Sequence, residues 1–367
     1  MTLRRKVKMK KSGKRGERAR KQDPGRCSKY GWAVLLLGTA SIAWICHSRK
    51  AWLIPYSSVF RGSSSREDEA GGDGAGSSAD VTRVAVCFFG VTRSLRWTLP
   101  SVQKRLFGVL ERGGMAVDVF VHTYALVEMN NDRAGENGVD YEAFINDFEA
   151  LQPTRSLVTN QDDFDLIWPD PMSLTHYNWV YSRQEAPGVI SNIFRAYWSM
   201  SLVWGLMAEY AREKRFEYDA VVLARPDVWF HYNVDLPSQT FPLPKGTVFI
   251  PSFDAPDLAN TRRNDRFAYG SVSAMRVAMN RLATLLESDA GKHRGDIDSE
   301  WVFGHHLLTN NISVRMLDLL VSRVRLTREI PLYDHRLVTE ACQSGDDPMA
   351  CEMVEAGLKF PEHMGAQ

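Results

Sequence analysis

The sequence predicts an α/β domain, with a mostly parallel sheet flanked by helices, behind a single N-terminal transmembrane helix. Short apolar runs rich in Val and Leu, such as Ala220–Ala224, suit strands that are buried on both faces, as in parallel sheets. Segments with the spacing of amphipathic helices, among them Leu95–Leu110 and Ile193–Tyr210, alternate with these runs. The stretch Tyr30–Cys46 is apolar throughout and predicts the membrane helix.

The predicted membrane helix has seventeen residues without a charge, flanked by aromatic side chains. At a rise of about 1.5 Å per residue it spans roughly 25 Å, which suits the thinner membranes of the early secretory pathway. Residues 1–29 carry thirteen Lys and Arg against Glu17 and Asp23, and this positive charge predicts a cytoplasmic N-terminus. A cleaved signal peptide and a buried soluble helix are the alternatives.

The chain therefore divides into a basic cytoplasmic tail (1–29), a signal anchor (30–46), a flexible stem (47–80) and a luminal domain (81–367). The stem is assigned because residues 57–80 are rich in Ser, Gly and acidic residues and poor in apolar ones. This is the layout of a single-pass type II protein of the Golgi or endoplasmic reticulum membrane, with the lipid bilayer as a partner. The tail has a net charge of +11 in a chain of +1, so the remainder carries −10, which argues against a nucleic-acid partner.

The five cysteines form no CxxC pair, so a structural zinc site is not expected. Cys342 and Cys351 lie close together in the sequence, and an oxidising lumen favours a local disulfide between them. Cys27 and Cys46 flank the predicted span. Cys87 lies inside an apolar run and is expected to be a buried small hydrophobe.

The luminal domain begins with a strand–helix–strand unit formed by Arg83–Phe89, Leu95–Leu110 and Ala116–Val121. Polar residues follow both strands, beginning at Gly90 and at His122. A right-handed crossover makes the two carboxyl ends neighbours, so a nucleotide-type ligand is expected across them. The GxGxxG fingerprint of dinucleotide-binding folds is absent.

The rest of the domain is less regular over residues 125–190 and regular again after them. Further strands are predicted at Arg155–Thr159, Ala220–Ala224, Thr247–Pro251, Ser313–Leu317 and Val324–Leu326, and further helices at Ile193–Tyr210, Ala274–Leu286 and Asp296–Leu308. Two segments match a DxD metal motif formally. Asp163-Phe164-Asp165 follows a polar segment instead of a strand, and Asp296-Ile297-Asp298 has the pattern of a helix cap.

Two segments concentrate candidate functional residues. Asp227 comes just after the apolar run Ala220–Ala224, where ligands bind in open α/β sheets, although an aspartate that caps a turn has the same pattern. The segment Arg263–Gly270 sets polar residues of both charge signs against Phe-Ala-Tyr, which suits a sugar or a diphosphate. A surface salt-bridge cluster is the alternative for this second segment.

The ordered motifs CFFGVTRSL, DVFVHTY, LARPDVWF, NDRFAYG and SEWVFGHHL resemble those of a group of glycosyltransferase-like proteins from microbial eukaryotes, algae and large viruses. The resemblance covers roughly residues 83–328. It implies the GT-A-like fold of nucleotide-diphospho-sugar transferases, in which a nucleotide-binding half precedes an acceptor-binding half. The donor implied is a UDP- or GDP-sugar.

The resemblance also implies roles for individual residues. Donor binding falls to Gly90, Thr92, Arg93, His122, Thr123, Arg225, Asn264 and Arg266. The catalytic candidates are Asp227, Asp265 and Glu300, of which Asp265 or Glu300 is the base that deprotonates the acceptor hydroxyl if the enzyme inverts.

Metal use is the open point of this resemblance. Asp227, with His306 as an auxiliary ligand, is the candidate site for Mn²⁺ or Mg²⁺. Arg225 stands where GT-A enzymes usually carry the first acid of DxD. The alternative is therefore that Arg225 itself balances the phosphate charge.

The expected function is transfer of a sugar from a nucleotide-sugar to a hydroxyl of a luminal glycan or glycoprotein. The alternative is a catalytically inactive, membrane-anchored carbohydrate-binding or scaffold protein of the same fold. A sulfotransferase is disfavoured because no phosphate-binding loop of the P-loop type follows the first strand.

Overall fold

The structure is a computed structural model. It describes residues 81–131, 135–167, 186–253, 262–282, 285, 299–331, 334, 352–353 and 356–359. The predicted tail, anchor and stem, the Cys342–Cys351 pair and the Asp296–Asp298 motif lie outside these residues. Within the described part of the chain, no helix has both the length and the apolar character needed to cross a bilayer.

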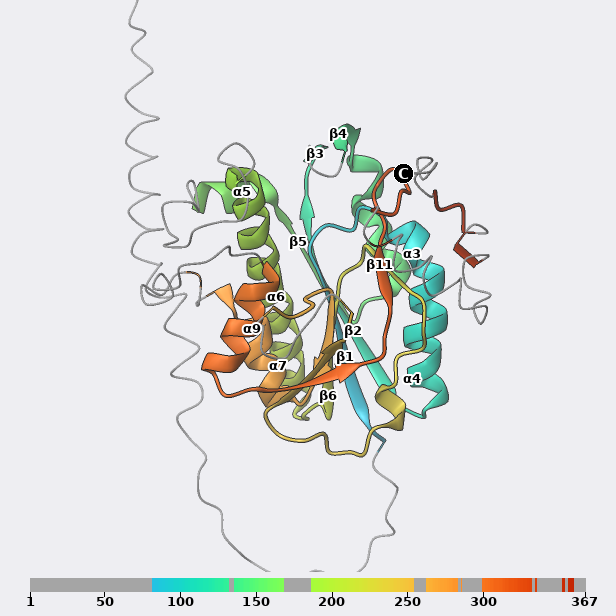
Figure 1. Ribbon diagram of the computed structural model, residues 1–367, viewed down its shortest axis with the longest axis vertical. Coiled ribbons are helices and arrows are strands. Elements are labelled where there is room, and N and C mark those ends of the chain that lie inside the picture. Colours follow the sequence, from blue (N-terminus) through green and yellow to red (C-terminus); the bar gives the residue numbers. More distant parts are fainter. Residues whose placement is uncertain are drawn as a thin grey trace, which may run out of the picture. The chain divides into compact units, whose positions relative to one another are not determined.

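A seven-stranded sheet with the order β10-β8-β9-β6-β1-β2-β5 forms the centre of the domain (Figure 1). Its strands are β1 (Arg83–Phe89), β2 (Ala116–Ala125), β5 (Arg155–Asn160), β6 (Ala220–Ala224), β8 (Thr247–Pro251), β9 (Phe267–Gly270) and β10 (Ser313–Leu317). Every neighbouring pair is parallel except the two that involve β9. The predicted mixed α/β architecture with a mostly parallel sheet is therefore confirmed.

The antiparallel strand β9 matters for the position of the residues before it. Phe267, its first residue, pairs with Ala224, the last residue of β6. The segment that leads into β9 therefore reaches the sheet at the edge where β6 ends. At the other end of β9, a Cβ on Gly270 would lie 2.5 Å from the carbonyl oxygen of Thr247, so β8 and β9 approach too closely there for a larger residue.

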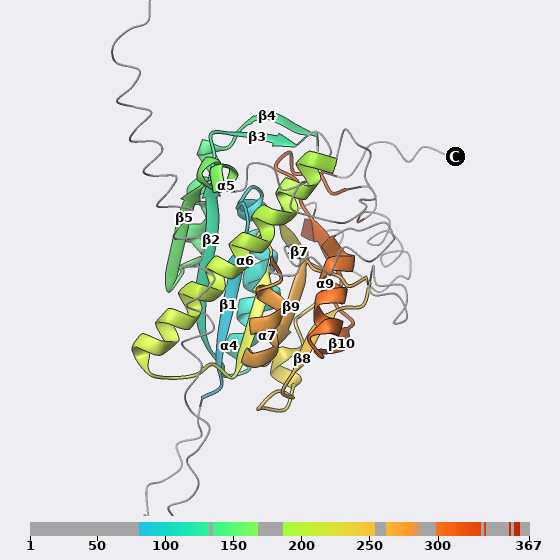
Figure 2. The ribbon, with the colours of Figure 1, turned by 90° about the vertical axis from the view of Figure 1, so that its left-hand side faces the viewer.

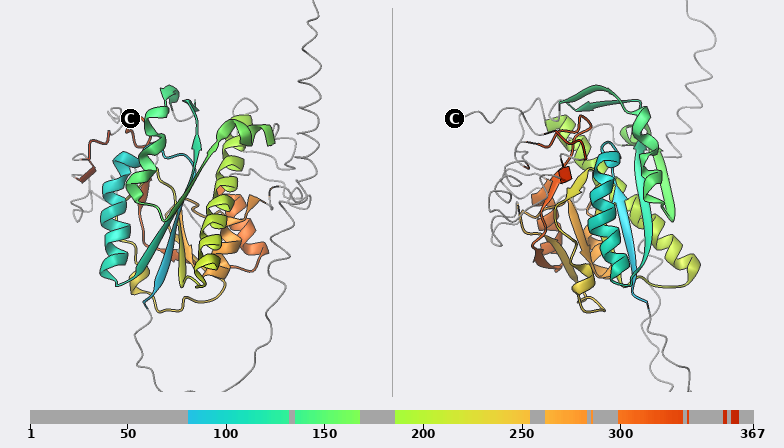
Figure 3. Two further views of the ribbon diagram at one scale, coloured as in Figure 1. Left: turned by 180° about the vertical axis from the view of Figure 1, so that it is seen from behind. Right: turned by 90° about the vertical axis from the view of Figure 1, so that its right-hand side faces the viewer.

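Helices cover both faces of the sheet (Figures 1 and 3). One face packs against a continuous helical segment formed by α3 (Leu95–Val102), the π-helical turn η1 (Gln103–Phe107) and α4 (Gly108–Arg112). The two-stranded sheet of β7 (Val228–Phe230) and β11 (Val321–Arg323) contributes to the same core. Leu95, Val102, Leu106 and Leu110 are fully buried there, as the predicted helical spacing requires.

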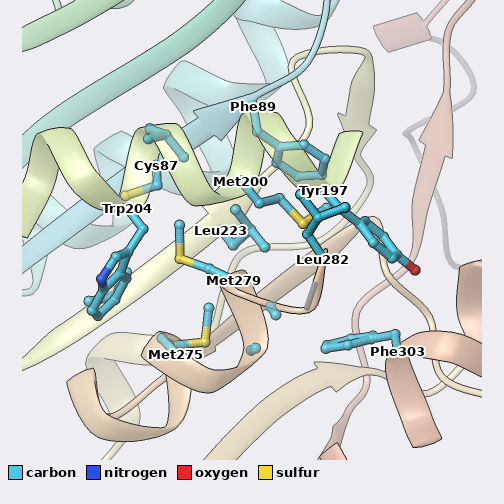
Figure 4. Close-up of a cluster of buried hydrophobic side chains, with 14 of the residues drawn as sticks. Cys87, Phe89, Tyr197, Met200, Trp204, Leu223, Met275, Met279, Leu282 and Phe303 are labelled. Atoms are coloured by element: carbon cyan, nitrogen blue, oxygen red, sulfur yellow. The ribbon is translucent and has the colours of Figure 1, made fainter. Parts of the chain in front are cut away.

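The other face is covered by α6 (Ala186–Lys214), α7 (Val272–Met279) and α9 (Ser299–Thr309), with α6 running obliquely across the sheet (Figure 2). Met200 of α6, Leu223 of β6 and Met279 of α7 point towards one another in this core (Figure 4). Cys87 is buried in the same cluster, which confirms its predicted structural role.

The structure departs from the sequence predictions in three segments. β2 continues to Ala125, so His122 and Thr123 lie inside the strand and not after it. Residues 125–160 are more regular than expected: a hairpin of β3 (Glu128–Asn131) and β4 (Glu136–Asp140) precedes the 3-10 helix η3 (Glu142–Leu151). The strand predicted at Val324–Leu326 is wrong, because β11 ends at Arg323 and the next amides bond to loops and side chains.

Two short helical elements, α5 and η5, lie between the main strands and helices. The formal DxD motif Asp163–Asp165 lies in the helix α5 (Gln161–Ile167), where Asp165 forms an ion pair with Arg195 of α6. The motif begins at the third residue after β5, but this strand alternates partly buried and exposed residues and is not a buried apolar run. The short 3-10 helix η5 (Leu236–Ser238) connects β7 to β8.

Candidate functional site

The strand order reverses at β1, and this reversal defines a candidate binding crevice. From β1 the chain crosses to β2 on one side, whereas β6 joins the other side of β1. In open α/β sheets, ligands bind outside the carboxyl ends of the strands at such a switch point. The segments that lie there are the loop after β1, which includes Arg93, and the turn Arg225–Asp227 after β6.

Asp227 joins these two segments. Its Oδ2 atom accepts hydrogen bonds from Nη2 and Nε of Arg93, at 2.6 and 3.1 Å, and from Nη2 of Arg225 at 2.7 Å. Its Oδ1 atom accepts a hydrogen bond from Nε of Arg225 at 2.8 Å. The residue is only 2% exposed, and burial alone would raise its pKa, but the two guanidinium groups hold the pKa of Asp227 well below its usual range.

Arg93 has a second buried carboxylate partner, which the sequence analysis missed. Glu136, at the start of β4, accepts a 2.8 Å hydrogen bond from Nη1 of Arg93 and is fully buried. Its other oxygen accepts a 2.6 Å hydrogen bond from the backbone amide of Leu326. Nothing in the polar sequence around Glu136 distinguishes it from a surface residue, so only the fold identifies it.

Three further arginines extend the cluster. Asp334 is buried and pairs with Arg323, at 3.0 Å, and with Arg266, at 3.4 Å. Burial would raise the pKa of Asp334, but these two guanidinium groups hold it below its ordinary value. Arg325 is half-buried; burial and the neighbouring guanidinium groups of Arg93 and Arg323 lower its pKa to about 10.

We call these residues the arginine cluster. It consists of Arg93, Arg225, Arg266, Arg323 and Arg325 with the buried carboxylates Asp227, Glu136 and Asp334. The guanidinium groups outnumber the buried carboxylates by two. Such an excess of positive charge, partly shielded from water, favours binding of an anion with delocalised charge.

Two partly exposed acids lie at the edge of the cluster. Burial would lower the pKa of Arg225, but nearby carboxylates raise it above the ordinary value of an arginine. Asp227 contributes most to this rise, and Asp265 and Glu300 contribute as well. Glu300 is the second residue of α9, and its Oε2 lies 3.9 Å from Nη2 of Arg262. The predicted base candidates are thus on the same side of the sheet as Arg225.

Four of the residues predicted to bind the donor instead shape the loop after β1. The amide of Gly90, at φ +88°, donates to Oγ of Ser199 at 2.7 Å, and Nδ1 of His122 lies 2.6 Å from the same oxygen. The Thr92 hydroxyl lies 2.8 Å from the Tyr141 hydroxyl.

His122, Thr92 and Thr123 are all fully buried, and burial lowers the pKa of His122 to about 3, so its imidazole is neutral. In the structure, these three side chains are inaccessible, and those of His122 and Thr92 bond within the protein. That they touch the donor stays a prediction. Gly90 is partly accessible through its backbone alone.

Asn264 and Arg266 are also buried where the sequence predicted ligand contacts. The side-chain amide of Asn264 donates to the carbonyl of Phe253 at 3.2 Å, and its Oδ1 accepts the backbone amide of Arg266 at 3.1 Å. Asn264 therefore fixes the entry to β9. Arg266 is 3% exposed and pairs with Asp334, so its charge acts on the cluster from within the protein.

His306 does not belong to the site. It lies on α9 and is nearly buried, and its Nε2 donates a 2.8 Å hydrogen bond to the carbonyl of Val277 on α7. Burial lowers the pKa of His306 to about 4. In the structure the ring of His306 thus bonds to the backbone of α7, and its role as an auxiliary metal ligand stays a prediction.

The residues present do not fit a divalent cation. Both oxygens of Asp227 already accept hydrogen bonds from arginines, and its partners across the site are cations. In the part of the chain that the structure describes, no group of three or more His, Cys, Asp or Glu side chains is arranged to hold a metal ion. A dication placed beside Asp227 would face the same guanidinium charges.

A shallow pocket adjoins the cluster. It has a volume of about 190 Å³ and is lined by Tyr232, Ser252, Phe253, Asp318, Leu319 and Leu320. The ring of Phe253 lies 5.4 Å from the guanidinium carbon of Arg266, so the pocket and the arginine cluster share a wall.

Comparison with known proteins places two glycosyltransferases among the solved structures that the chain is similar to. No family model matches the sequence, and no curated protein matches it. One is the apo form of GlyE from Streptococcus pneumoniae TIGR4, at 10% identity and a TM-score of 0.31, covering 64% of this chain and 45% of GlyE. The other is apo mouse xyloside xylosyltransferase 1, at 12% identity and a TM-score of 0.34, covering 65% of this chain and 84% of that protein.

The chain thus spans less than half the length of GlyE. Similarities with TM-scores this low establish neither the fold nor the activity of the chain. The function is therefore argued from the residues of the site.

Proposed function

We infer that the chain is a GT-A-like glycosyltransferase that moves a sugar from a UDP- or GDP-sugar to a hydroxyl of a glycan or glycoprotein. The observation that carries this proposal is the arginine cluster at the switch point between β1 and β6, with two acids at its edge. A nucleoside diphosphate needs balancing positive charge as it leaves, and an acceptor hydroxyl needs a base. The motifs that resemble glycosyltransferases supply both acids and three arginines of the cluster, Arg93, Arg225 and Arg266.

The reaction follows from these two groups. The bond between the anomeric carbon and the diphosphate oxygen breaks, and its electron pair stays on the diphosphate next to the guanidinium groups. The acceptor oxygen forms a bond to the anomeric carbon, and its proton passes to Asp265 or Glu300. Holding donor and acceptor together in this arrangement supplies much of the rate enhancement of such transfers.

The pocket beside Phe253 is where we place the acceptor sugar. Aromatic faces pack against the C–H face of a sugar ring, and the Ser252 hydroxyl and Asp318 carboxylate are hydrogen-bond partners for sugar hydroxyls. The pocket borders Arg266 of the cluster, so an acceptor bound there lies next to the donor. The cellular setting that goes with this proposal is a type II protein of the Golgi or endoplasmic reticulum membrane.

The test is a panel of UDP- and GDP-sugars with glycan acceptors, using the purified full-length protein and measuring release of the nucleoside diphosphate. At least one donor is expected to give acceptor-dependent turnover. Asp265→Asn or Glu300→Gln, whichever removes the base, is expected to lower kcat by about 100- to 10,000-fold with little change in the donor KM.

Glu111→Gln on the exposed end of α4 is the matched control and should leave the rates unchanged. Absence of donor binding across the whole panel, together with binding of free glycan, would overturn the proposal. That pair of results would favour the inactive carbohydrate-binding protein.

A further inference from the structure

Arg325 is held beside the arginine cluster by its neighbours in the chain. The amide of Val324 donates to the carbonyl of Asp227 at 2.8 Å, and the amide of Leu326 donates to Glu136 at 2.6 Å. Arg325 thus lies between two residues whose amides bond to Asp227 and Glu136, the two acids that also pair with Arg93. Its own backbone is fixed as well, because its amide donates to the carbonyl of Glu329 at 2.8 Å.

The side chain of Arg325 differs from the other guanidinium groups of the cluster. Arg93, Arg225, Arg266 and Arg323 each form an ion pair with a buried carboxylate. The described residues give the guanidinium of Arg325 neither a hydrogen bond nor an ion pair, although the residue is half-buried. Burial and the repulsion from Arg93 and Arg323 outweigh the attraction that Arg325 feels from Glu136 and Asp227, so its pKa is lowered. An unpaired cation in such surroundings is unfavourable unless an anion joins it.

Arg225 provides the second guanidinium group that a ligand can contact. Asp227 engages its Nε and Nη2 atoms, and the side chain is 26% exposed. Its Nη1 hydrogens take no part in this contact, so they remain available to a ligand while Asp227 holds the guanidinium plane in place. Both oxygens of this carboxylate are thus engaged by guanidinium groups, and it fixes the plane of a partly exposed arginine.

We propose that Arg325 and Arg225 bind the two phosphate groups of the donor and balance the charge of the leaving diphosphate in place of a divalent cation. This inference rests on the proposed function for the identity of the diphosphate. The guanidinium groups act by charge and hydrogen bonding to the phosphate oxygens as the electron pair arrives there. Asp227 acts through Arg225 and Arg93 and is a positioning residue.

The decisive measurement is calorimetric binding of inorganic pyrophosphate to the purified full-length protein in the presence of EDTA. The wild-type protein is expected to bind, and Arg325→Ala to weaken binding by about 10- to 100-fold. Arg325→Lys keeps the charge but loses the planar fork and should fall between the two. Arg328→Ala, at an exposed arginine of the same turn, is the matched control and should bind like the wild type.

Thermal unfolding without ligand separates a binding role from a structural one. Removal of the Arg325 guanidinium relieves its burial and its repulsion from Arg93 and Arg323, and these outweigh the lost attraction to Glu136 and Asp227, so the Tm of Arg325→Ala should equal or exceed that of the wild type. Pyrophosphate should raise the Tm of the wild type and not that of the variant. A lower Tm for both Arg325→Ala and Arg325→Lys without ligand would mean a structural role and overturn the proposal.

The outcomes also distinguish this inference from the proposed function. Pyrophosphate binding that requires Mn²⁺, or that is equal in wild type and Arg325→Ala, overturns the inference even if sugar transfer is observed. Transfer that survives EDTA and falls with Arg325→Ala supports both. Arginine-dependent pyrophosphate binding without turnover of any nucleotide-sugar supports the diphosphate site and contradicts the transferase.

Discussion

Asp227 shows how one buried carboxylate organises the site. It is shared by two guanidinium groups that come from opposite sides of the switch point, after β1 and after β6. Each arginine alone would be a costly buried charge, and the carboxylate makes both tolerable. The catalytic role predicted for Asp227 from its place after a strand is therefore better described as positioning of Arg93 and Arg225.

Asp227→Asn is expected to destabilise the protein by about 3–5 kcal/mol at neutral pH, because it removes the carboxylate partner of Arg225 and leaves Arg93 with Glu136 alone. The pKa of Asp227 is lowered in the folded state, so its contribution is complete above the ordinary value of 3.8 and is lost as the pH falls below it. The difference in unfolding free energy between wild type and variant should therefore shrink between pH 4 and pH 3. Urea unfolding at pH 7, 4 and 3 measures it.

Asp147→Asn provides the comparison for this prediction. Asp147 forms two 2.8 Å hydrogen bonds with Arg96, but the arginine is 41% exposed. Exposed pairs contribute about 0–1 kcal/mol. Equal losses of stability in the two variants would show that burial does not set the strength of the Asp227 contacts.

At the scale of elements, the β3–β4 hairpin and the segment 324–326 hold the cluster from opposite sides. Glu136 of the hairpin bonds to Arg93 and to the amide of Leu326, while the Ser94 hydroxyl bonds to the carbonyl of Val324 at 2.7 Å. The segment after β11 is thus tied both to the hairpin and to the loop after β1. Its backbone amides and carbonyls bond to loop residues and side chains and not to a neighbouring strand.

Glu136→Gln is expected to loosen this segment without unfolding the sheet. The amide side chain keeps the volume but loses the charge that pairs with Arg93, at a cost of about 1–3 kcal/mol. Hydrogen exchange at the amides of Val324 and Leu326 should accelerate, while the amides of β1 stay protected. Glu128→Gln, an exposed residue of the same hairpin, should leave exchange unchanged. Unchanged protection at Leu326 in Glu136→Gln would contradict the role given to Glu136.

The sequence predicted those elements whose formation depends on local pattern. The bounds of β1, β6 and β8 agree with the apolar runs, because these strands are buried along almost their whole length. The bounds of β10 also agree, although this strand alternates exposed and partly buried residues. The resemblance assigned Arg93, Arg225 and Asp265 to one site. The pairing of β6 with β1 and the antiparallel direction of β9 explain how the segments that carry them meet at one edge.

Other parts of the site could not be predicted in this way. Glu136, Arg325 and Asp334 lie in polar segments without periodicity, and their burial results from tertiary packing. His122 and Thr123 were expected at a strand end, whereas β2 continues because β5 pairs with it up to Asn160. Buried polar residues inside a strand have the same sequence pattern as exposed residues just after one.

At the scale of the whole molecule, buried histidines connect folding to pH. His122 contacts Ser199 next to the loop after β1, and His306 joins α9 to α7. His231, the residue after β7, lies 2.8 Å from the Ser322 hydroxyl of β11. Burial lowers the pKa of His122 to about 3 and the pKa values of His231 and His306 to about 4. The three therefore remain neutral in the folded protein at pH values where they are protonated in the unfolded chain.

The protein is consequently expected to lose stability as the pH falls from 6.5 towards 4. In this range the unfolded state binds more protons than the folded state, so unfolding free energy decreases by about 1.4 kcal/mol per pH unit for each buried histidine. Urea unfolding of the full-length protein at pH 7, 6 and 5 measures the slope. His306→Gln keeps a donor near the Val277 carbonyl. It should reduce the dependence of the unfolding free energy on pH by the contribution of one histidine, about 1.4 kcal/mol per pH unit, even if it lowers stability at pH 7. A stability that stays constant from pH 7 to pH 5 would show that these imidazoles accept protons without leaving the core, and would contradict the neutral, buried state assigned to them.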